Sequence, residues 1–312
     1  ADLEHLPEVR RVLESVGEVR YVAARPEALA AAVRDADAYF ASMHVRITAE
    51  MMAAAPRLRA IATPSTGLDH IDMEAAGRRG IVVIGLKDDR ELLDRITSTA
   101  ELTWGLILAC ARRLPEAFEA GRRGTWARDA VRGHQIAYKT LGVLGLGRLG
   151  AMVAGYGRAF RMKVLGCDVR AVEVPGVERV DLERLVSESD VLTIHIHLTE
   201  ENRGLIDRRR LQAMKRGSVL INTSRGAIVD EAALLEALEH GPLAAAGLDV
   251  IEGEWRPDLT DHPLVAYARG HPNLIITPHV GGVTHEAQKM AYAAAAGKLK
   301  AWFEGVRTTN GT

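Results

Sequence analysis

The stretch Lys139–Gly150, KTLGVLGLGRLG, constrains the fold of this chain more than any other. A short apolar run, Thr140–Leu146, predicts a buried β-strand, and a helical pattern follows Gly145-Leu-Gly147-Arg-Leu-Gly150. Glycines at this spacing let the backbone approach a pyrophosphate, which the amino end of a helix binds through free N–H groups. A tight strand–helix turn without a cofactor would show the same glycines, so the context must decide between the two.

The context favours a dinucleotide. The next predicted strand, KVLGCD, ends at Asp168, 18 residues after Gly150, and a carboxylate there can accept hydrogen bonds from a ribose. Arg148 and Leu149 complete the turn and are predicted to contact the cofactor with the glycines. Asp168 predicts NAD rather than NADP, because a carboxylate repels a 2′-phosphate. Arg170 counts against this preference, since an arginine there could pair with that phosphate.

Composition excludes several classes of function. The chain has 312 residues, which predicts two domains, and it is 47% hydrophobic and 26% charged, as in ordinary globular proteins. A net charge of −1 gives no electrostatic footprint for nucleic acid or an acidic membrane. No apolar run reaches the ~18 residues of a membrane span and no signal peptide is visible, so we expect a cytoplasmic protein. Cys110 and Cys167 stand inside apolar runs, which indicates buried free thiols, and neither has the spacing of a metal or redox pair.

Residues 1–93 alternate between two kinds of pattern, which predicts a parallel sheet covered on both faces. The predicted strands are EVRYVAA, AYFASM, LRAIATPS and GIVVIGL, and the predicted helices are 6–15, 26–34 and 48–55. A first strand should precede the first helix, but only ADLEH stands there. We expect that strand to be short, displaced or missing from this sequence.

The second half predicts another α/β domain. A mostly apolar helix over 97–120 should connect the domains and could form a dimer surface. Strands are then predicted at TLGVLGLG, KVLGCD, DVLTIHI, SVLINTS, AAGLDV and LIITPHV. A final alanine-rich helix over 284–303 should return to the first domain. The predicted domains are therefore 1–94 with 280–312, and 95–279.

Three polar side chains follow strands whose carboxyl ends should share one sheet edge, where open parallel sheets bind ligands. Arg225 can clamp a carboxylate, His279 can exchange a proton with a carbonyl or carbinol, and Glu254 can orient the imidazole. Each has an ordinary alternative: a solvated arginine, a polar loop and a helix cap. Together, on the edge that carries the glycine-rich turn, they predict a hydride-transfer site.

Four separated motifs, STGLDHID, INTSRGAIVDEAAL, LDVIEGE and TPHVGG, carry a resemblance to a known family. They are similar to those of the D-isomer-specific 2-hydroxyacid dehydrogenases, in particular the short phosphoglycerate-dehydrogenase-like members, and the resemblance covers nearly the whole chain. It implies a Rossmann NAD-binding domain at 95–279 and a flavodoxin-like substrate domain at 1–94 and 280–312. It also implies that the substrate is a small 2-keto or 2-hydroxy acid. We expect the protein to be a homodimer.

The resemblance implies roles for individual residues. Arg225, Glu254 and His279 would be the catalytic trio, with His279 as the acid and base for hydride transfer between NAD(H) and C2 of the acid. The substrate carboxylate would be held by Arg225 and by the backbone of 65–67. The residues implied to bind substrate are Ser65, Thr66 and Gly67, and those added to the cofactor site are His195, Thr223, Asp249 and Gly281.

Departures from the family leave the far end of the substrate open. Trp255 stands where the family often has proline, and Ser42 stands where an arginine is common. His44 or Arg46 could replace that arginine, or could simply lie on the surface.

Three rivals to the main interpretation remain. A 3-phosphoglycerate dehydrogenase proper would need extra cations, for which Lys87, Arg90 and Arg46 are candidates. A relative that oxidises phosphite uses the same trio. An NAD-sensing corepressor-like binding protein is the alternative of another class.

Overall fold

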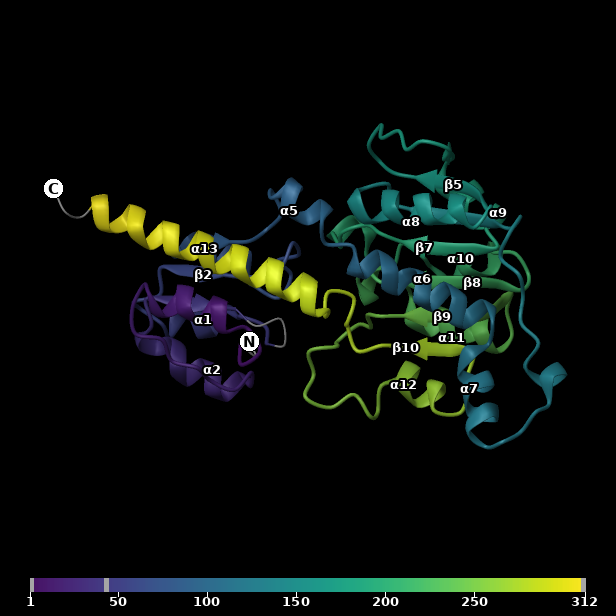
Figure 1. Ribbon diagram of the computed structural model, residues 1–312, viewed down its shortest axis with the longest axis horizontal. Coiled ribbons are helices and arrows are strands. Elements are labelled where there is room, and N and C mark those ends of the chain that lie inside the picture. Colours follow the sequence, from purple (N-terminus) through teal and green to yellow (C-terminus); the bar gives the residue numbers. More distant parts are fainter. Residues whose placement is uncertain (1–2, 42–44, 310–312) are drawn as a thin grey trace. The chain divides into compact units, whose positions relative to one another are not determined.

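The computed structural model describes residues 3–41 and 45–309. The chain forms two compact units, of which unit 1 comprises Ala1–Ile96 with Val283–Thr312 and unit 2 comprises Thr97–Gly282. Each unit is built on its own parallel sheet, which confirms the predicted α/β class (Figure 1). Within the described residues, no helix is both long and apolar enough to cross a membrane.

The sheet of unit 2 has seven strands in the order β10-β9-β8-β7-β4-β5-β6, all parallel. This is a doubly wound order. From β4 the chain first adds β5 and β6 on one side, and it then adds β7 to β10 on the other side. Five of the strands lie within the predicted runs. β9 overlaps its predicted run and begins two residues before it, and the unpredicted β6 has two residues. The bounds are β4 Thr140–Leu144, β5 Lys163–Cys167, β6 Glu178–Arg179, β7 Val191–Ile194, β8 Ser218–Asn222, β9 Leu243–Leu248 and β10 Leu274–Ile276.

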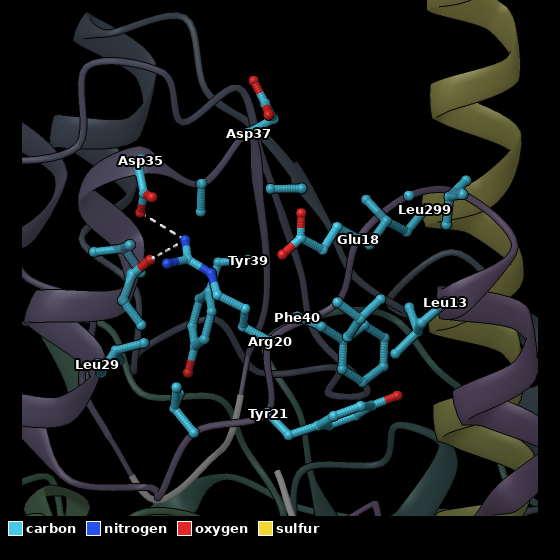
Figure 2. Close-up of a pocket in the computed structure, with 18 of the residues that line it drawn as sticks. Leu13, Glu18, Arg20, Tyr21, Leu29, Asp35, Asp37, Tyr39, Phe40 and Leu299 are labelled. Carbon is cyan, nitrogen blue, oxygen red and sulfur yellow. Dashed lines mark hydrogen bonds and ion pairs between the residues drawn. The ribbon is translucent and has the colours of Figure 1, made fainter.

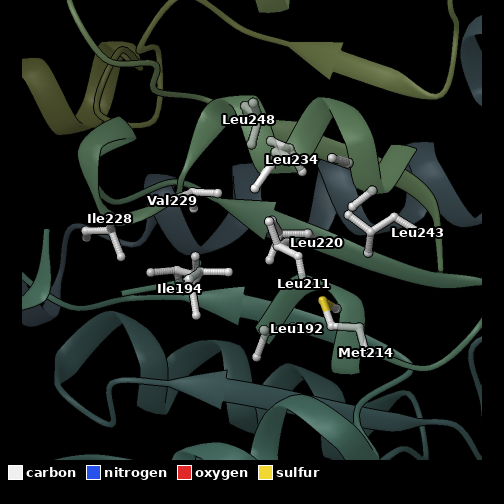
Figure 3. Close-up of a cluster of buried hydrophobic side chains, with 14 of the residues drawn as sticks. Leu192, Ile194, Leu211, Met214, Leu220, Ile228, Val229, Leu234, Leu243 and Leu248 are labelled. Carbon is white, nitrogen blue, oxygen red and sulfur yellow. The ribbon is translucent and has the colours of Figure 1, made fainter. Parts of the chain in front are cut away.

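Helices cover both faces of this sheet because its strands are apolar on both sides. On β4, Leu141 and Val143 pack against α6 and α8, whereas Leu144 belongs to the opposite core with α9 to α12. Figure 3 shows part of that second core, including Leu192, Leu220 and Leu248. The bounds of these helices are α6 Ser98–Ala111, α8 Arg148–Ala159, α9 Leu182–Glu188, α10 Arg208–Ala213, α11 Glu231–Glu239 and α12 Pro263–Ala268.

Aspartates fix the start of several helices. The side chains of Asp181, Asp207 and Asp230 accept hydrogen bonds from the third helical N–H of α9, α10 and α11. Such caps satisfy donors that have no partner within a helix. The short 3-10 helices of this unit are η2 Arg128–Val131, η3 Glu200–Asn202 and η4 Gly226–Ile228.

The prediction of one helix over 97–120 was wrong. The structure has α6, which ends at Ala111, and a separate α7 over Leu114–Arg122. Arg113 between them has a left-handed φ of 50°, and Pro115 stands in the first turn of α7. Proline cannot continue a helix because it lacks the N–H group and its ring clashes with the preceding turn.

Unit 1 has a smaller parallel sheet in the order β1-β2-β3. Ala38 and Phe40 of β1 belong to one apolar layer with α1 and α13, and Tyr39 faces a second layer with α2, α3 and α4. The bounds are β1 Ala38–Phe40, β2 Ala60–Ala62, β3 Val82–Ile84, α1 Pro7–Glu14, α2 Pro26–Ala32, η1 Val33–Asp35, α3 Ala49–Ala53, α4 Met73–Arg78, α5 Arg90–Asp94 and α13 His285–Thr309.

The prediction of a strand at EVRYVAA was also wrong. Residues 18–24 belong to no sheet, and most of their side chains are exposed. A β-strand exists only by pairing with a neighbour, and no backbone hydrogen bond joins this segment to β1. High strand propensity alone therefore did not produce a strand.

Candidate active site

Three neighbouring strands of unit 2 bring the predicted trio to one edge of the sheet. β8, β9 and β10 are adjacent and parallel, so the segments after Asn222, Leu248 and Ile276 leave the sheet at the same edge. These segments carry Arg225, Glu254 and His279. All three residues belong to unit 2.

His279 and Glu254 form a direct pair. Nδ1 of His279 lies 2.7 Å from Oε1 of Glu254, and both side chains are largely shielded from solvent. Burial by itself lowers the pKa of His279, but the hydrogen bond to Glu254 and its negative charge outweigh burial and raise that pKa above its ordinary value. The pair therefore favours the imidazolium, which is the form that can donate a proton.

Asp249 holds the segment that carries His279. Its carboxylate accepts hydrogen bonds from the Thr277 hydroxyl at 2.6 Å and from the N–H groups of Val280 and Gly281 at 2.9 and 2.8 Å. Its backbone carbonyl accepts the N–H of His279 at 2.8 Å. His279 has a left-handed φ of 52°, which is uncommon outside glycine. These bonds stabilise a backbone conformation that the sequence did not predict, while the role of Asp249 in cofactor binding stays a prediction.

Arg225 begins the turn into η4. The Asn222 side chain donates to the Arg225 carbonyl at 2.8 Å, and an Arg225 N–H donates to the Ser224 carbonyl at 2.7 Å. The side chain is half-buried, and its positive charge acts to lower the pKa of His279. That opposing influence means that the guanidinium and the imidazole are electrostatic neighbours in the site.

A buried polar cluster anchors the Glu254 loop. The Glu231 carboxylate accepts the N–H of Glu252 at 2.6 Å and lies 3.3 Å from Nε2 of His262. Nδ1 of His262 accepts the N–H of Leu264, so Nε2 carries the proton of the neutral ring. Sequence reasoning missed this cluster, although Glu231 and His262 flank the loop in polar positions.

The glycine-rich turn has the shape that a dinucleotide needs. Gly145 has a φ of 92°, and a Cβ there would lie 2.6 Å from the His195 carbonyl oxygen. A Cβ on Gly150 would overlap the carbonyl oxygen of Gly145. These two glycines serve the turn itself. At Gly147, in contrast, a Cβ would meet only an Arg170 nitrogen at 3.6 Å, so this glycine leaves room for a ligand above the amino end of α8.

Asp168 is tied to the same turn. Its carboxylate accepts the Leu146 N–H at 2.8 Å and the Arg170 side chain at 3.2 Å. Burial raises the pKa of Asp168, but the hydrogen bonds from Arg170 and Leu146 outweigh burial and lower it. The carboxylate is thus charged at neutral pH, and Arg170 partly neutralises it.

The remaining predicted cofactor residues lie on the same sheet edge. His195 follows β7, and its buried Nε2 has no hydrogen-bond partner among the described residues. Burial lowers the pKa of His195 to about 4, so the ring is neutral. The Thr223 hydroxyl lies 2.9 Å from that of Thr103. Arg148 and Leu149 form the half-buried first turn of α8. The glycine-rich turn, the Asp168 carboxylate and the unpaired Nε2 of His195 are therefore suited to bind a dinucleotide.

The residues predicted to hold the substrate carboxylate lie in unit 1. Ser65, Thr66 and Gly67 follow β2, and the Ser65 carbonyl accepts the N–H of Leu86 at 3.1 Å. Their part in substrate binding stays a prediction. Ser42 and His44 lie outside the described residues, and Arg46 is exposed.

Among the residues that the structure describes, no three His, Cys, Asp or Glu side chains are placed to hold a metal ion. Both cysteines are free, and burial raises the pKa of the Cys110 thiol to about 12.

The doubly wound sheet, its glycine-rich turn and the His–Glu pair on the same edge define a dinucleotide-binding dehydrogenase-like protein. Residues 104–281 match the family model for the D-isomer specific 2-hydroxyacid dehydrogenase, NAD binding domain. The chain belongs to this family, and the resemblance found in its motifs is confirmed.

Relatives agree with this assignment. The chain is 39% identical to a glyoxylate reductase of Aeropyrum pernix over 97% of its length and 91% of the relative's. It is 37% identical to a D-3-phosphoglycerate dehydrogenase of Methanocaldococcus jannaschii over 96% of its length, but it spans 56% of that relative. A crystal structure of D-lactate dehydrogenase from Aquifex aeolicus, complexed with NAD and lactic acid, is 29% identical with a TM-score of 0.81, covering 98% of this chain and 94% of that one.

Proposed function

We propose that this protein is an NAD-dependent dehydrogenase that interconverts a small 2-keto acid and the corresponding D-2-hydroxy acid. The observation that carries the proposal is the His279–Glu254 pair on the sheet edge that also holds the glycine-rich turn. A proton donor with a raised pKa beside a dinucleotide site suits reduction of a carbonyl.

The cofactor would be held by the turn at Gly145–Gly150 and by Asp168. When bound, NADH supplies the hydride that adds to C2 of the keto acid. His279 donates its proton to the carbonyl oxygen, and in the oxidative direction the neutral ring accepts the hydroxyl proton. Glu254 keeps the ring oriented and favours its charged form. Asp249 acts through the 277–281 backbone, which holds His279 in place.

Arg225 would bind the substrate carboxylate through its planar fork. In this role the positive charge of Arg225 also opposes the rise in the pKa of His279 that Glu254 causes. Two charges of opposite effect thus poise one imidazole for both directions of the reaction.

The names of the relatives support the proposed substrate class. A glyoxylate reductase is similar over 97% of this chain and 91% of its own length, so we propose a small keto acid such as glyoxylate. A 3-phosphoglycerate dehydrogenase is the second candidate, favoured by the Methanocaldococcus relative. Its phosphate would need cations, and Lys87, Arg90 and Arg46 are exposed in unit 1.

We also propose a cytoplasmic homodimer. The described side chains of α7 include none that is buried, and Phe118 and Trp126 are 65% and 76% exposed. Exposed aromatic side chains are typical of surfaces that bind another protein.

A panel assay tests the activity. The purified protein is mixed with NADH or NADPH and with glyoxylate, pyruvate, hydroxypyruvate or phosphohydroxypyruvate, and the oxidised cofactors are tested with phosphite. We expect NADH-dependent reduction of at least one unphosphorylated keto acid. Activity confined to phosphohydroxypyruvate or phosphite would replace the proposed substrate class. Tight NADH binding without any turnover would favour the binding-protein alternative.

A further inference from the structure

Two ion pairs of this chain differ in how far they are shielded from water. In unit 1, Arg20 lies 2.6 Å from Asp35 beside a pocket, and both side chains are exposed (Figure 2). Exposed pairs of this kind contribute little to stability because water screens both charges. In unit 2, Glu231 and His262 lie 3.3 Å apart, and their side chains are only 19% and 7% exposed. A carboxylate withdrawn from water loses its hydration, so hydrogen bonds to the protein must compensate for that loss.

The hydrogen bonds of the Glu231–His262 pair converge on the backbone of Glu252. Oε1 of Glu231 accepts the Glu252 N–H at 2.6 Å. Nε2 of His262 lies 3.2 Å from the Glu252 carbonyl oxygen, so its proton is shared between that carbonyl and the Glu231 carboxylate. The pair therefore holds both polar groups of the Glu252 backbone.

The pair also closes the neck of a loop. Residues 253–261, all of which the structure describes, form no helix or strand, and such segments are usually mobile unless their ends are fixed. Glu252 and His262 are the two ends of this loop, and the contact between them joins the ends. The neck rests on helices, because Glu231 is the first residue of α11 and His262 caps α12 by accepting the Leu264 N–H.

Glu254 stands just inside this neck. Only Gly253, which has a left-handed φ of 74°, separates it from Glu252. The Cα atoms of Glu252 and Glu254 are thus at most ~7 Å apart. A shift of the Glu252 backbone must therefore move Glu254, whose Oε1 lies 2.7 Å from Nδ1 of His279.

Two further contacts reach Glu252, and they differ in weight. A Cβ on Gly226, the residue after Arg225, would overlap the backbone at Ile251 and Glu252, so η4 packs closely against the neck. The Glu252 side chain also lies 2.7 Å from Arg203, but both side chains are exposed and this ion pair contributes little. The neck is therefore fixed mainly by the Glu231–His262 pair and by close packing.

We propose that Glu231 and His262 are positioning residues, which close the neck of loop 252–262 and thereby keep Glu254 in contact with His279. The kinetic consequence of this inference rests on the proposed dehydrogenase function. Without the pair, the loop moves more freely and Glu254 spends less time beside the imidazole. The pKa of His279, which the hydrogen bond to Glu254 and its charge raise, then falls toward its value in Glu254→Gln.

The pKa of His279 is measured by NMR titration of the full chain with isotope-labelled histidine, and its signal is assigned by its loss in His279→Asn. Glu231→Ala should lower this pKa most of the way to its value in Glu254→Gln. Glu231→Gln should lower it much less, because the amide oxygen still accepts the Glu252 N–H although the charge is gone. Glu239→Ala, on the exposed end of the same helix, is the matched control and should leave the pKa unchanged.

His262→Asn is a second test of the neck. Asparagine is a good helix cap, so α12 keeps its start, but the shorter side chain does not reach the Glu252 carbonyl. This variant should lower the pKa of His279 as Glu231→Ala does. In the Glu254→Gln background neither substitution should lower it further, because the charge that the neck positions is already absent. Arg225 and Asp249, the other charged groups that act on this ring, are unchanged in every variant.

Steady-state kinetics supply the second readout. In Glu231→Ala, kcat for keto-acid reduction should fall about 10- to 100-fold, as expected when a supporting residue loses its place. The dissociation constant of NADH should change little, because the neck does not include the glycine-rich turn or Asp168.

Two outcomes would overturn the proposal. An unchanged pKa of His279 in whichever of Glu231→Ala and His262→Asn folds would mean that the neck does not position Glu254. An equal fall in Glu231→Gln and Glu231→Ala would mean that the charge of Glu231 acts on His279 directly. Absence of keto-acid turnover by the unmodified protein would instead contradict the proposed function, and the titration, which needs no substrate, would still decide this inference.

Discussion

Nδ1 of His279 lies 2.7 Å from Oε1 of Glu254, although 25 residues separate them in the chain. The pair exists because parallel β9 and β10 end side by side. The backbone around His279 is held by Asp249, the residue directly after β9. The ends of two adjacent strands therefore bring together His279, its charged partner Glu254 and Asp249, which holds the backbone of His279.

The pair predicts a shift in the pH profile. The raised pKa of His279 keeps the imidazolium at pH values below that pKa, so keto-acid reduction should fall as pH rises through it. Glu254→Gln removes the charge and should lower the pKa, which moves this limb to lower pH. Above the limb, each unit of pKa lost should reduce the rate about tenfold. The check is kcat/KM against pH in both directions, and an unmoved limb would mean that Glu254 does not tune His279.

Arg225→Lys should lower kcat/KM for keto acids by more than about tenfold, or about 1.4 kcal/mol, because lysine keeps the charge but loses the planar fork. The dissociation constant of NADH should change much less. Arg122→Lys, on exposed α7, is the matched control. An Arg225→Ala variant within about threefold of the unmodified enzyme, or about 0.7 kcal/mol, would remove Arg225 from the substrate site.

Cofactor preference depends on Asp168 and Arg170. Asp168→Ala should lower kcat/KM for NADH more than for NADPH. The variant loses the carboxylate that accepts hydrogen bonds from the ribose of NADH, and it also loses the negative charge that repels the 2′-phosphate of NADPH. Arg170→Ala should widen the preference for NADH, because the guanidinium that neutralises Asp168 disappears. Both are measured as the ratio of kcat/KM for the two cofactors. A ratio near one in the unmodified enzyme would contradict the assignment of NAD.

Gly147→Ala separates cofactor binding from folding. A Cβ at this position has room in the protein, so Tm should change little, but it would occupy the space needed by a pyrophosphate. NADH affinity should fall at least about tenfold, or 1.4 kcal/mol. Gly155→Ala in α8 is the control, where a Cβ meets nothing within 4 Å. It should raise stability by about 0.5–1 kcal/mol and leave NADH binding unchanged.

Asp249→Asn should disturb the segment that carries His279. Both carboxylate oxygens accept hydrogen bonds, and an amide nitrogen cannot accept one. We expect a loss of about 1–3 kcal/mol in the free energy of unfolding and a lower kcat. Denaturant titration and steady-state kinetics measure these quantities. Exposed Asp258→Asn is the control, and an unchanged kcat for Asp249→Asn would show that the anchor is dispensable.

Several features could be predicted from sequence because they depend on local pattern. Apolar runs and the glycines between them predict the glycine-rich turn and the strands around Leu141 and Leu220. They also predict which residues come directly after each strand. Parallel strands share a carboxyl edge, so Arg225, Glu254 and His279 could be expected together. The four motifs added the family, which no periodicity could supply.

Other features depend on partners that lie far away in the chain. Segment 18–24 has strand propensity but no paired neighbour, so it forms no strand. The left-handed backbone of His279 is held by Asp249, which follows a different strand. The break at Arg113, in contrast, has a local cause, because Pro115 stands in the first turn of the next helix. The Glu231–His262 cluster and the Asp249 anchor likewise join residues from separate elements. Sequence pattern determined which residues reach the active edge, whereas tertiary hydrogen bonding decided how each is oriented, because orientation depends on donors and acceptors that no local pattern encodes.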